Sequence, residues 1–341
     1  MAIGHHLLAD IWFWLIGFIL ILYVILDGFD LGAGMLFLWT RDARRRGLIL
    51  GAVGYTWHAN QTWLVVLGGL LFGAFPLAYG VVLSALYIPF GLMLLGLIIR
   101  GISFEFREEA HDKGLWNLAF GGGSLLAALG QGFVLGGILS GLNLAGDTYA
   151  GGVAGWLNPF TVLVSAGLGF GYLLLGATYL IFKTGPEMDH YCREQASVAA
   201  FLSLCITLAV IIWFFQINPA AVQKWTSWPD LLITSFPFLL SLFTFLLLLN
   251  TLRTGTSDTA PFIQAVLIFA FSFISLAGSL HPYILPPEVT VYAAAGQALT
   301  LKVMLVVMVP LLPLMLLYNA FQYQIMSGNV SEAGYDESKG L

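Results

Sequence analysis

The sequence predicts an all-α integral membrane protein with about nine transmembrane helices. Its 341 residues are 59% hydrophobic and only 9% charged, whereas soluble domains carry about a quarter charged residues. The charges are gathered into short breaks between apolar runs, and each run is close to the roughly 20 residues that a helix needs to cross a membrane. These observations exclude a water-soluble fold.

The expected helices follow one another along nearly the whole chain. The first apolar run is longer than the core of a signal peptide, so we expect it to remain in the mature protein. The helices should lie at residues 11–39, 50–73, 76–99, 116–141, 158–182, 197–217, 230–251, 260–281 and 299–323. We expect two four-helix bundles plus one extra helix. Residues 1–326 then form the membrane domain, and the acidic segment 327–341 should be a disordered cytoplasmic tail.

The basic residues predict the orientation of the chain. They fall mostly in the first, third, fifth and seventh connections: Arg41, Arg44, Arg45, Arg46, Arg100, Arg107, Lys113, Lys183, Arg193 and Arg253. The connections between them hold Lys224 and little else. Because basic loops stay in the cytoplasm, the amino terminus should be outside and the carboxyl terminus inside. Five tryptophans lie near predicted outer ends, as in an aromatic belt: Trp12, Trp14, Trp156, Trp225 and Trp228.

Two groups of polar residues lie inside the first two expected helices. Asp27 and Asp30 are three residues apart and therefore share one helix face. The stretch from Trp57 to Trp63 places His58 and Asn60 near the start of the second helix. The two helices form a hairpin centred near Arg44, so Asp30 and His58 should lie at matching depth, on the order of 15 Å from the cytoplasmic ends.

This pairing has two interpretations. Polar residues inside a membrane are costly and usually functional, and a carboxylate beside an imidazole could relay protons inward from the cytoplasm. Alternatively, Asp30 and His58 are a structural pair that only stabilises the hairpin. The residues themselves leave both interpretations open.

Arg100 is expected to end the third helix at the cytoplasmic side. A short amphipathic loop containing Glu105 and Arg107 should follow it. The simplest interpretation of Arg100 is an anchor whose charged head reaches toward water.

The sequence offers few ligands for a cofactor or a nucleic acid. Haem needs axial His, Met or Cys inside the bundle, and among the histidines only His58 is expected to be deep. We therefore expect the chain to bind no haem and no metal and to have no catalytic residue of its own. It also lacks the basic stripe that a nucleic-acid partner requires.

Several motifs resemble the second subunit of cytochrome bd-type quinol oxidases. The most specific is Asp27-Gly28-Phe29-Asp30-Leu31-Gly32-Ala33-Gly34, which is similar to the family's DGFDxGxG box. Further similarities are Trp57 with Asn60 and Trp63, residues 68–76, Arg100-Gly101 through Phe104-Glu105-Phe106-Arg107, Pro286-Pro287 with Thr290, and residues 299–302. The resemblance covers nearly the whole chain.

The resemblance implies a heterodimer in the bacterial cytoplasmic membrane. A haem-bearing subunit I would carry the quinol site with haem b and haem d, or a third haem b, while this chain stabilises the assembly. The complex would oxidise quinol and reduce oxygen to water. Quinone and lipid are implied as ligands of the complex, and a small single-span subunit is a further candidate partner.

The resemblance also implies that this subunit adds a cytoplasmic proton route. In the family that route starts at an acidic residue two positions before Asn60, where this sequence has His58. Either Asp27 and Asp30 take the acidic role, or the path is modified. The candidate path residues are thus His58, Asp30 and Asp27, supported by Trp57, Asn60, Trp63, Arg100 and Glu105.

Two other classes of function compete with this one. Intramembrane Asp and His also mark the substrate path of proton-coupled transporters and channels, although such proteins often have paired interrupted helices that are not evident here. A purely structural membrane scaffold is the third class. A co-purifying haem-bearing partner distinguishes the oxidase from both.

Overall fold

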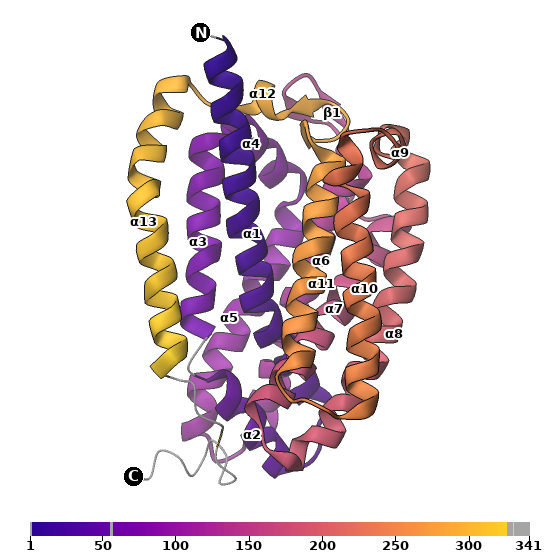
Figure 1. Ribbon diagram of the computed structural model, residues 1–341. Coiled ribbons are helices and arrows are strands. Elements are labelled where there is room, and N and C mark those ends of the chain that lie inside the picture. Colours follow the sequence, from indigo (N-terminus) through magenta and orange to yellow (C-terminus); the bar gives the residue numbers. More distant parts are fainter. Residues whose placement is uncertain (1, 55–56, 326–329, 331–341) are drawn as a thin grey trace.

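The structure is a bundle of long helices that run between two ends of the molecule (Figure 1). This computed structural model describes residues 2–54, 57–325 and 330. The long helices are α1 (Ala2–Trp39), α3 (Trp57–Ala74), α5 (Tyr87–Glu109), α6 (Gly114–Ser140), α7 (Pro159–Lys183), α8 (Pro186–Ile217), α10 (Ser235–Thr254), α11 (Ala260–Leu280) and α13 (Ala298–Ile325). They confirm the predicted all-α fold.

Eight of these helices in the described part of the chain are long and apolar enough to cross a membrane. The exception is α3, the second of the nine expected spans, because its first turns carry His58, Asn60 and Gln61. It nevertheless lies along α1 and α13 over much of their length (Figure 1). Its Asn60 is therefore sheltered by the neighbouring helices, whereas His58 at its start is exposed.

Short elements cap both ends of the bundle. Helix α2 (Ala43–Val53) follows α1 at the end that also carries the arginines 41 and 44–46, which we call the basic end. Asp42 caps α2, since its Oδ1 accepts a hydrogen bond from the Arg45 backbone N–H (2.8 Å). The opposite end, which we call the hairpin end, carries the short helices α9 (Pro219–Thr226) and α12 (Val291–Ala294), the turn η1 (Asp230–Leu232) and two hairpins.

Both hairpins are antiparallel and very short. Strand β1 (Leu144–Ala145) pairs with β2 (Thr148–Tyr149), with Leu144 opposite Tyr149. Strand β3 (Tyr283–Leu285) pairs with β4 (Val289–Thr290), with Leu285 opposite Val289. The first helix starts at this end and α13 finishes at the basic end (Figure 1).

The third expected span is two helices rather than one. Helix α4 (Pro76–Ala85) ends before Leu86, and α5 begins at Tyr87. Pro89 has no N–H to donate to the carbonyl of Ala85, so a continuous helix would lose a hydrogen bond there. The second helix starts afresh, and α5 then extends to Glu109. The expected loop after Arg100 was wrong: Glu105 and Arg107 lie on the continuing helix.

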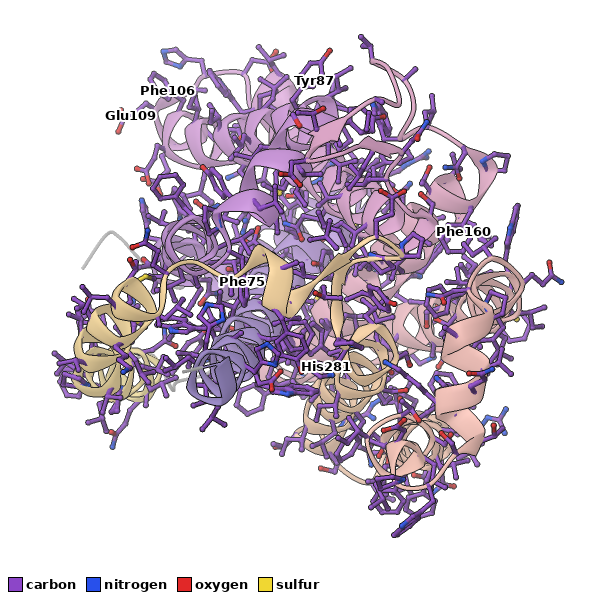
Figure 2. The ribbon with its side chains drawn as sticks, turned by 90° about the horizontal axis from the view of Figure 1, so that it is seen from above. Phe75, Tyr87, Phe106, Glu109, Phe160 and His281 are labelled. Carbon is purple, nitrogen blue, oxygen red and sulfur yellow. The ribbon has the colours of Figure 1, made fainter. Side chains whose placement is uncertain are left out.

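The helix contacts fall into two groups, which are joined by the packing of α7 on both α1 and α6. In the first group α6 packs on α5 and on α1, and α1 packs on α3. In the second, α7 packs on α8, and α10 and α11 pack on each other and on this pair. Helix α13 contacts α1 and α3 and lies at the edge of the bundle seen from above (Figure 2). This arrangement matches two four-helix groups plus one extra helix.

Glycines allow the helices around α1 to approach closely. A Cβ on Gly32 would lie 1.8 Å from the Tyr172 carbonyl oxygen of α7. A Cβ on Gly123 of α6 would lie 2.8 Å from the Arg100 backbone nitrogen of α5. These two crossings bring α1, α5, α6 and α7 together where the polar residues lie.

The expected tail at 327–341 is outside the described residues except for Val330, whose backbone N–H donates to the Lys183 carbonyl (3.1 Å).

Candidate functional site

The candidate site is built on two aspartates of α1. Asp27 and Asp30 are both fully buried, with 0% of their surface exposed. Asp30 is nine residues from the end of α1 at Trp39, which places it about 13 Å from the basic end of that helix. The predicted depth of Asp30 and the shared helix face of the two aspartates are therefore found in the structure. The expectation that His58 lies equally deep was wrong, because α3 begins at Trp57 and His58 is exposed in its first turn.

Arg100 lies between the two aspartates. Its Nη1 is 3.3 Å from Asp27 Oδ1 and its Nη2 is 3.7 Å from Asp30 Oδ2. Only 2% of the Arg100 surface is exposed. The expectation of a solvent-reaching anchor was wrong, because α5 continues past Arg100 and keeps this residue inside the bundle.

An amide from α3 holds the second aspartate. Asn60 Nδ2 donates to Asp30 Oδ2 (2.8 Å) and to the Leu26 carbonyl (3.0 Å). The Tyr323 hydroxyl of α13 donates to Asn60 Oδ1 (2.7 Å). Three helices thus meet at Asp30 through these side chains.

A similar arrangement holds the first aspartate. Gln131 Nε2 of α6 donates to the Tyr23 hydroxyl (2.7 Å) and, over a longer distance, to Asp27 Oδ2 (3.4 Å). The Tyr172 hydroxyl of α7 donates to Gln131 Oε1 (2.5 Å). Sequence reasoning missed Tyr23, Gln131, Tyr172 and Tyr323. Gln131 could have been found, because it is an amide inside an otherwise apolar span.

His58 lies in the first turn of α3, on the exposed surface of the bundle. Its ring is 3.5 Å from the ring of Trp57, centroid to centroid. Residues two positions apart on an α-helix are separated by about 200° around its axis. His58 therefore points away from α1 when Asn60 points toward it. Among the described residues, the α3 side chain that hydrogen-bonds to Asp30 is therefore Asn60, not His58.

The other supporting residues are divided between the interior and the surface. Trp63 is buried, with 2% of its surface exposed. Trp57 packs over Gly101, where a Cβ would lie 3.3 Å from its ring. Glu105 is exposed on α5, and its neighbours Phe106 and Glu109 lie at the periphery of the bundle (Figure 2). Glu105 is thus not brought to the aspartates.

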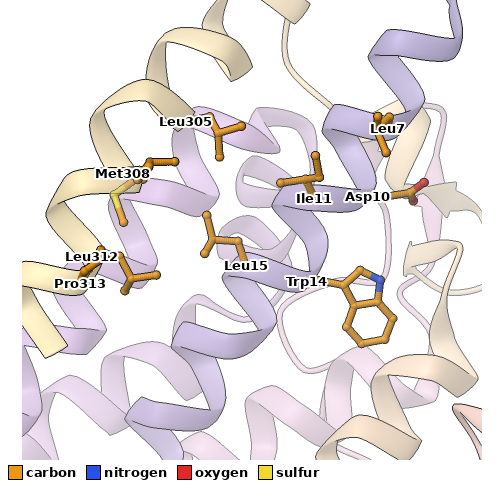
Figure 3. Close-up of a pocket in the computed structure, with 10 residues that line it drawn as sticks. Leu7, Asp10, Ile11, Trp14, Leu15, Leu305, Met308, Leu312 and Pro313 are labelled. Atoms are coloured by element: carbon orange, nitrogen blue, oxygen red, sulfur yellow. The ribbon is translucent and has the colours of Figure 1, made fainter.

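A second polar cluster lies at the hairpin end. Asp10 Oδ1 is 2.9 Å from His281 Nε2, and the Tyr292 hydroxyl donates to Asp10 Oδ2 (3.4 Å). Beside it, an apolar groove of about 630 Å³ lies between α1 and α13, with Ile11 and Leu15 on one side and Met308 on the other (Figure 3). Nothing charged other than Asp10 lines this groove.

Comparison with known proteins identifies the family. A family model described as cytochrome bd terminal oxidase subunit II matches residues 8–326. The chain belongs to this family. It is 30% identical to subunit 2 of the cytochrome bd-I ubiquinol oxidase of Escherichia coli K12, over 97% of both chains.

Two further relatives support the assignment. Subunit 2 of the cytochrome bd ubiquinol oxidase of Bacillus subtilis is 26% identical, over 95% of this chain and 97% of that protein. The structure of bd oxidase from Geobacillus thermodenitrificans superposes with a TM-score of 0.77 at 21% identity, covering 94% of this chain and 98% of that one, and so shares its fold.

Family membership makes the chain a subunit of a cytochrome bd quinol oxidase, an oxidoreductase complex of the bacterial inner membrane. It implies haems in the complex and a subunit I as partner. Two histidines of the described chain already have polar partners. His281 and His5 are engaged by Asp10 and the Gly296 carbonyl, and no cluster of three or more His, Cys, Asp or Glu in the described ranges could hold a metal ion.

Proposed function

We propose that this chain is the haem-free second subunit of its oxidase, that it stabilises the haem-bearing subunit, and that it supplies a proton route from the cytoplasm. In this proposal the partner carries the haems and the quinol site. The route leads through Asp30 and Asp27, with His58 as its entrance. The observation that carries the proposal is the buried group of Asp27, Arg100 and Asp30.

The charge of this group supports a role in proton transfer. With both aspartates ionised and Arg100 protonated, the group has a net charge of −1, and one added proton makes it neutral. Burying an unbalanced charge is costly, and a buried ion pair is often no more stable than apolar residues of the same volume. The presence of three ionisable groups inside a membrane bundle therefore favours a functional role over a purely stabilising one.

The positions of the polar residues support an inward route from the basic end. His58 lies in the first turn of α3, nearer that end than Asn60, and it is exposed. An imidazole has two ring nitrogens, so it can accept a proton at one and release a proton from the other. The positive-inside rule makes the basic end cytoplasmic. Protons would enter at His58 and reach the carboxylates behind Asn60.

Asp30→Asn in the assembled oxidase tests this proposal. The variant keeps the shape of the side chain and can still accept a hydrogen bond from Asn60, but it cannot take up a proton. Quinol-driven oxygen consumption should fall about 100-fold or more, as when a proton-transfer group is lost. Asp147→Asn, in the exposed hairpin between β1 and β2, should consume oxygen at the wild-type rate.

Assembly must be measured beside activity, because breaking a buried pair can cost about 3–5 kcal/mol. The haem spectrum and the ratio of the two subunits should match those of the wild-type complex. Asp30→Glu, which restores a carboxylate, should recover much of the turnover. Wild-type turnover in a normally assembled Asp30→Asn complex would contradict the proposal.

A further inference from the structure

The two buried carboxylates have the same kinds of hydrogen-bond partners. On one side, Tyr323 donates to Asn60 Oδ1 (2.7 Å) and Asn60 Nδ2 donates to Asp30 Oδ2 (2.8 Å). On the other side, Tyr172 donates to Gln131 Oε1 (2.5 Å), and Gln131 Nε2 lies 3.4 Å from Asp27 Oδ2. Each aspartate thus faces an amide whose carbonyl oxygen is bound by a tyrosine.

This arrangement determines which end of the amide faces the carboxylate. A side-chain amide has an oxygen that only accepts and a nitrogen that only donates. When a tyrosine hydroxyl occupies the Asn60 oxygen, the nitrogen is the end that turns toward Asp30. Without the hydroxyl, the Asn60 oxygen loses its partner, and the amide is held only by the hydrogen bonds from its nitrogen to Asp30 and to the Leu26 carbonyl, so its plane is less well fixed.

The tyrosine on the Asp30 side comes from the edge of the bundle. Helix α13 is largely exposed, with Val306 at 73% and Tyr318 at 66% exposed on its outer side. At the hairpin end, the Trp12 indole N–H donates to the Leu301 carbonyl (3.1 Å) and ties α13 to α1. Near the basic end, Tyr323 reaches inward to Asn60. The Tyr323 ring also packs against the hydrophobic core, so its hydroxyl is delivered to Asn60 from a packed position.

We propose that Tyr323 is a positioning residue for proton transfer, acting through Asn60 to hold Asp30 in its productive orientation. This inference rests on the proposed proton route. Tyr323 itself does not need to carry a proton. Its hydroxyl fixes the amide, and the amide fixes the carboxylate.

The experiment compares Tyr323→Phe with Tyr318→Phe in the assembled oxidase. Both variants lose one hydroxyl from α13, but only Tyr323 faces the site. Tyr323→Phe should lower kcat for oxygen consumption about tenfold, the effect of one hydrogen bond in a charged network. KM for quinol and the haem spectrum should be unchanged, and Tyr318→Phe should match the wild type.

A double variant tests whether Tyr323 acts through Asn60. If it does, adding Tyr323→Phe to Asn60→Ala should cause no further loss of kcat. Full additivity of the two losses overturns the inference. So does wild-type kcat in Tyr323→Phe, or failure of that variant to assemble, which would assign Tyr323 to the packing of α13.

The outcome also separates this inference from the proposed function. An inactive Asp30→Asn beside a fully active Tyr323→Phe overturns the role of Tyr323 alone. A fully active, assembled Asp30→Asn overturns the proton route, and the role of Tyr323 falls with it.

Discussion

At the scale of single residues, the exposed His58 and the buried Asp30 have different tasks. Asp30 is held by Arg100 and Asn60 and has little freedom to move. His58 touches Trp57 and is open on its other side. An entrance group must exchange protons with water, whereas an inner group must be kept in one place. The two environments suit these two roles.

His58→Ala should lower oxygen consumption about tenfold or more while the haem spectrum stays intact, because it removes a proton carrier without disturbing the buried group. His58→Asp, which introduces the acidic residue that the resemblance implies at this position, should retain substantial turnover. His111→Ala, in the exposed connection between α5 and α6, is the control and should be fully active.

Oxygen uptake by the purified complex at several pH values is the measurement. If His58→Ala assembles normally and turns over at the wild-type rate, protons enter elsewhere and His58 is only a surface residue of α3.

At the scale of helices, close crossings set the position of Arg100. Gly123 of α6 faces the backbone of α5 at Gly96 and Arg100, where a Cβ would lie 2.7 Å from the Gly96 oxygen. Gly122, the next residue along α6, has nothing within 4 Å of its Cβ position. Substituting each of these adjacent glycines by alanine therefore distinguishes the effect of helix packing on stability from the effect of helix propensity.

Gly123→Ala should destabilise the complex by about 1–3 kcal/mol, because the new methyl group forces α5 and α6 apart. Gly122→Ala should be neutral or slightly stabilising, since alanine favours helices over glycine. Thermal unfolding of the purified complex gives both values. Equal stability of the two variants would contradict the crossing.

The sequence predicted the number and order of the long helices and the depth of Asp30. It could not predict that Arg100 reaches the aspartates, because that depends on α5 continuing to Glu109 after the break at Leu86. It paired Asp30 with His58, whereas in the described part of the chain the α3 side chain that hydrogen-bonds to Asp30 is Asn60. The partner of Asp30 depends on the rotation of α3 about its own axis. The uncharged polar residues in the first turns of α3 do not specify that rotation.

At the scale of the whole molecule, the distribution of basic residues predicts which end faces the cytoplasm. The structure places α1 and α13 so that the chain starts at the hairpin end and its last helix finishes at the basic end (Figure 1). The inward direction of the proposed proton route depends on the basic end being cytoplasmic.

Reporter fusions test this orientation. An enzyme that is active only in the cytoplasm should work when fused after Arg46 or after Leu341 and should be inactive when fused near Asp147. The reverse pattern would place the basic end outside and remove the cytoplasmic origin of the route.

The most direct test of the central claim is the optical spectrum of the material purified from membranes through a tag on this chain. A haem-free subunit of a cytochrome bd quinol oxidase should co-purify with a second subunit, and the complex should show a haem b spectrum, with haem d or further haem b, and consume oxygen with quinol. When the chain is produced without that partner, the haem bands should be absent. The account would be contradicted if the chain purified from its own membranes were colourless and had no partner subunit, or if the chain produced without the partner bound about one haem.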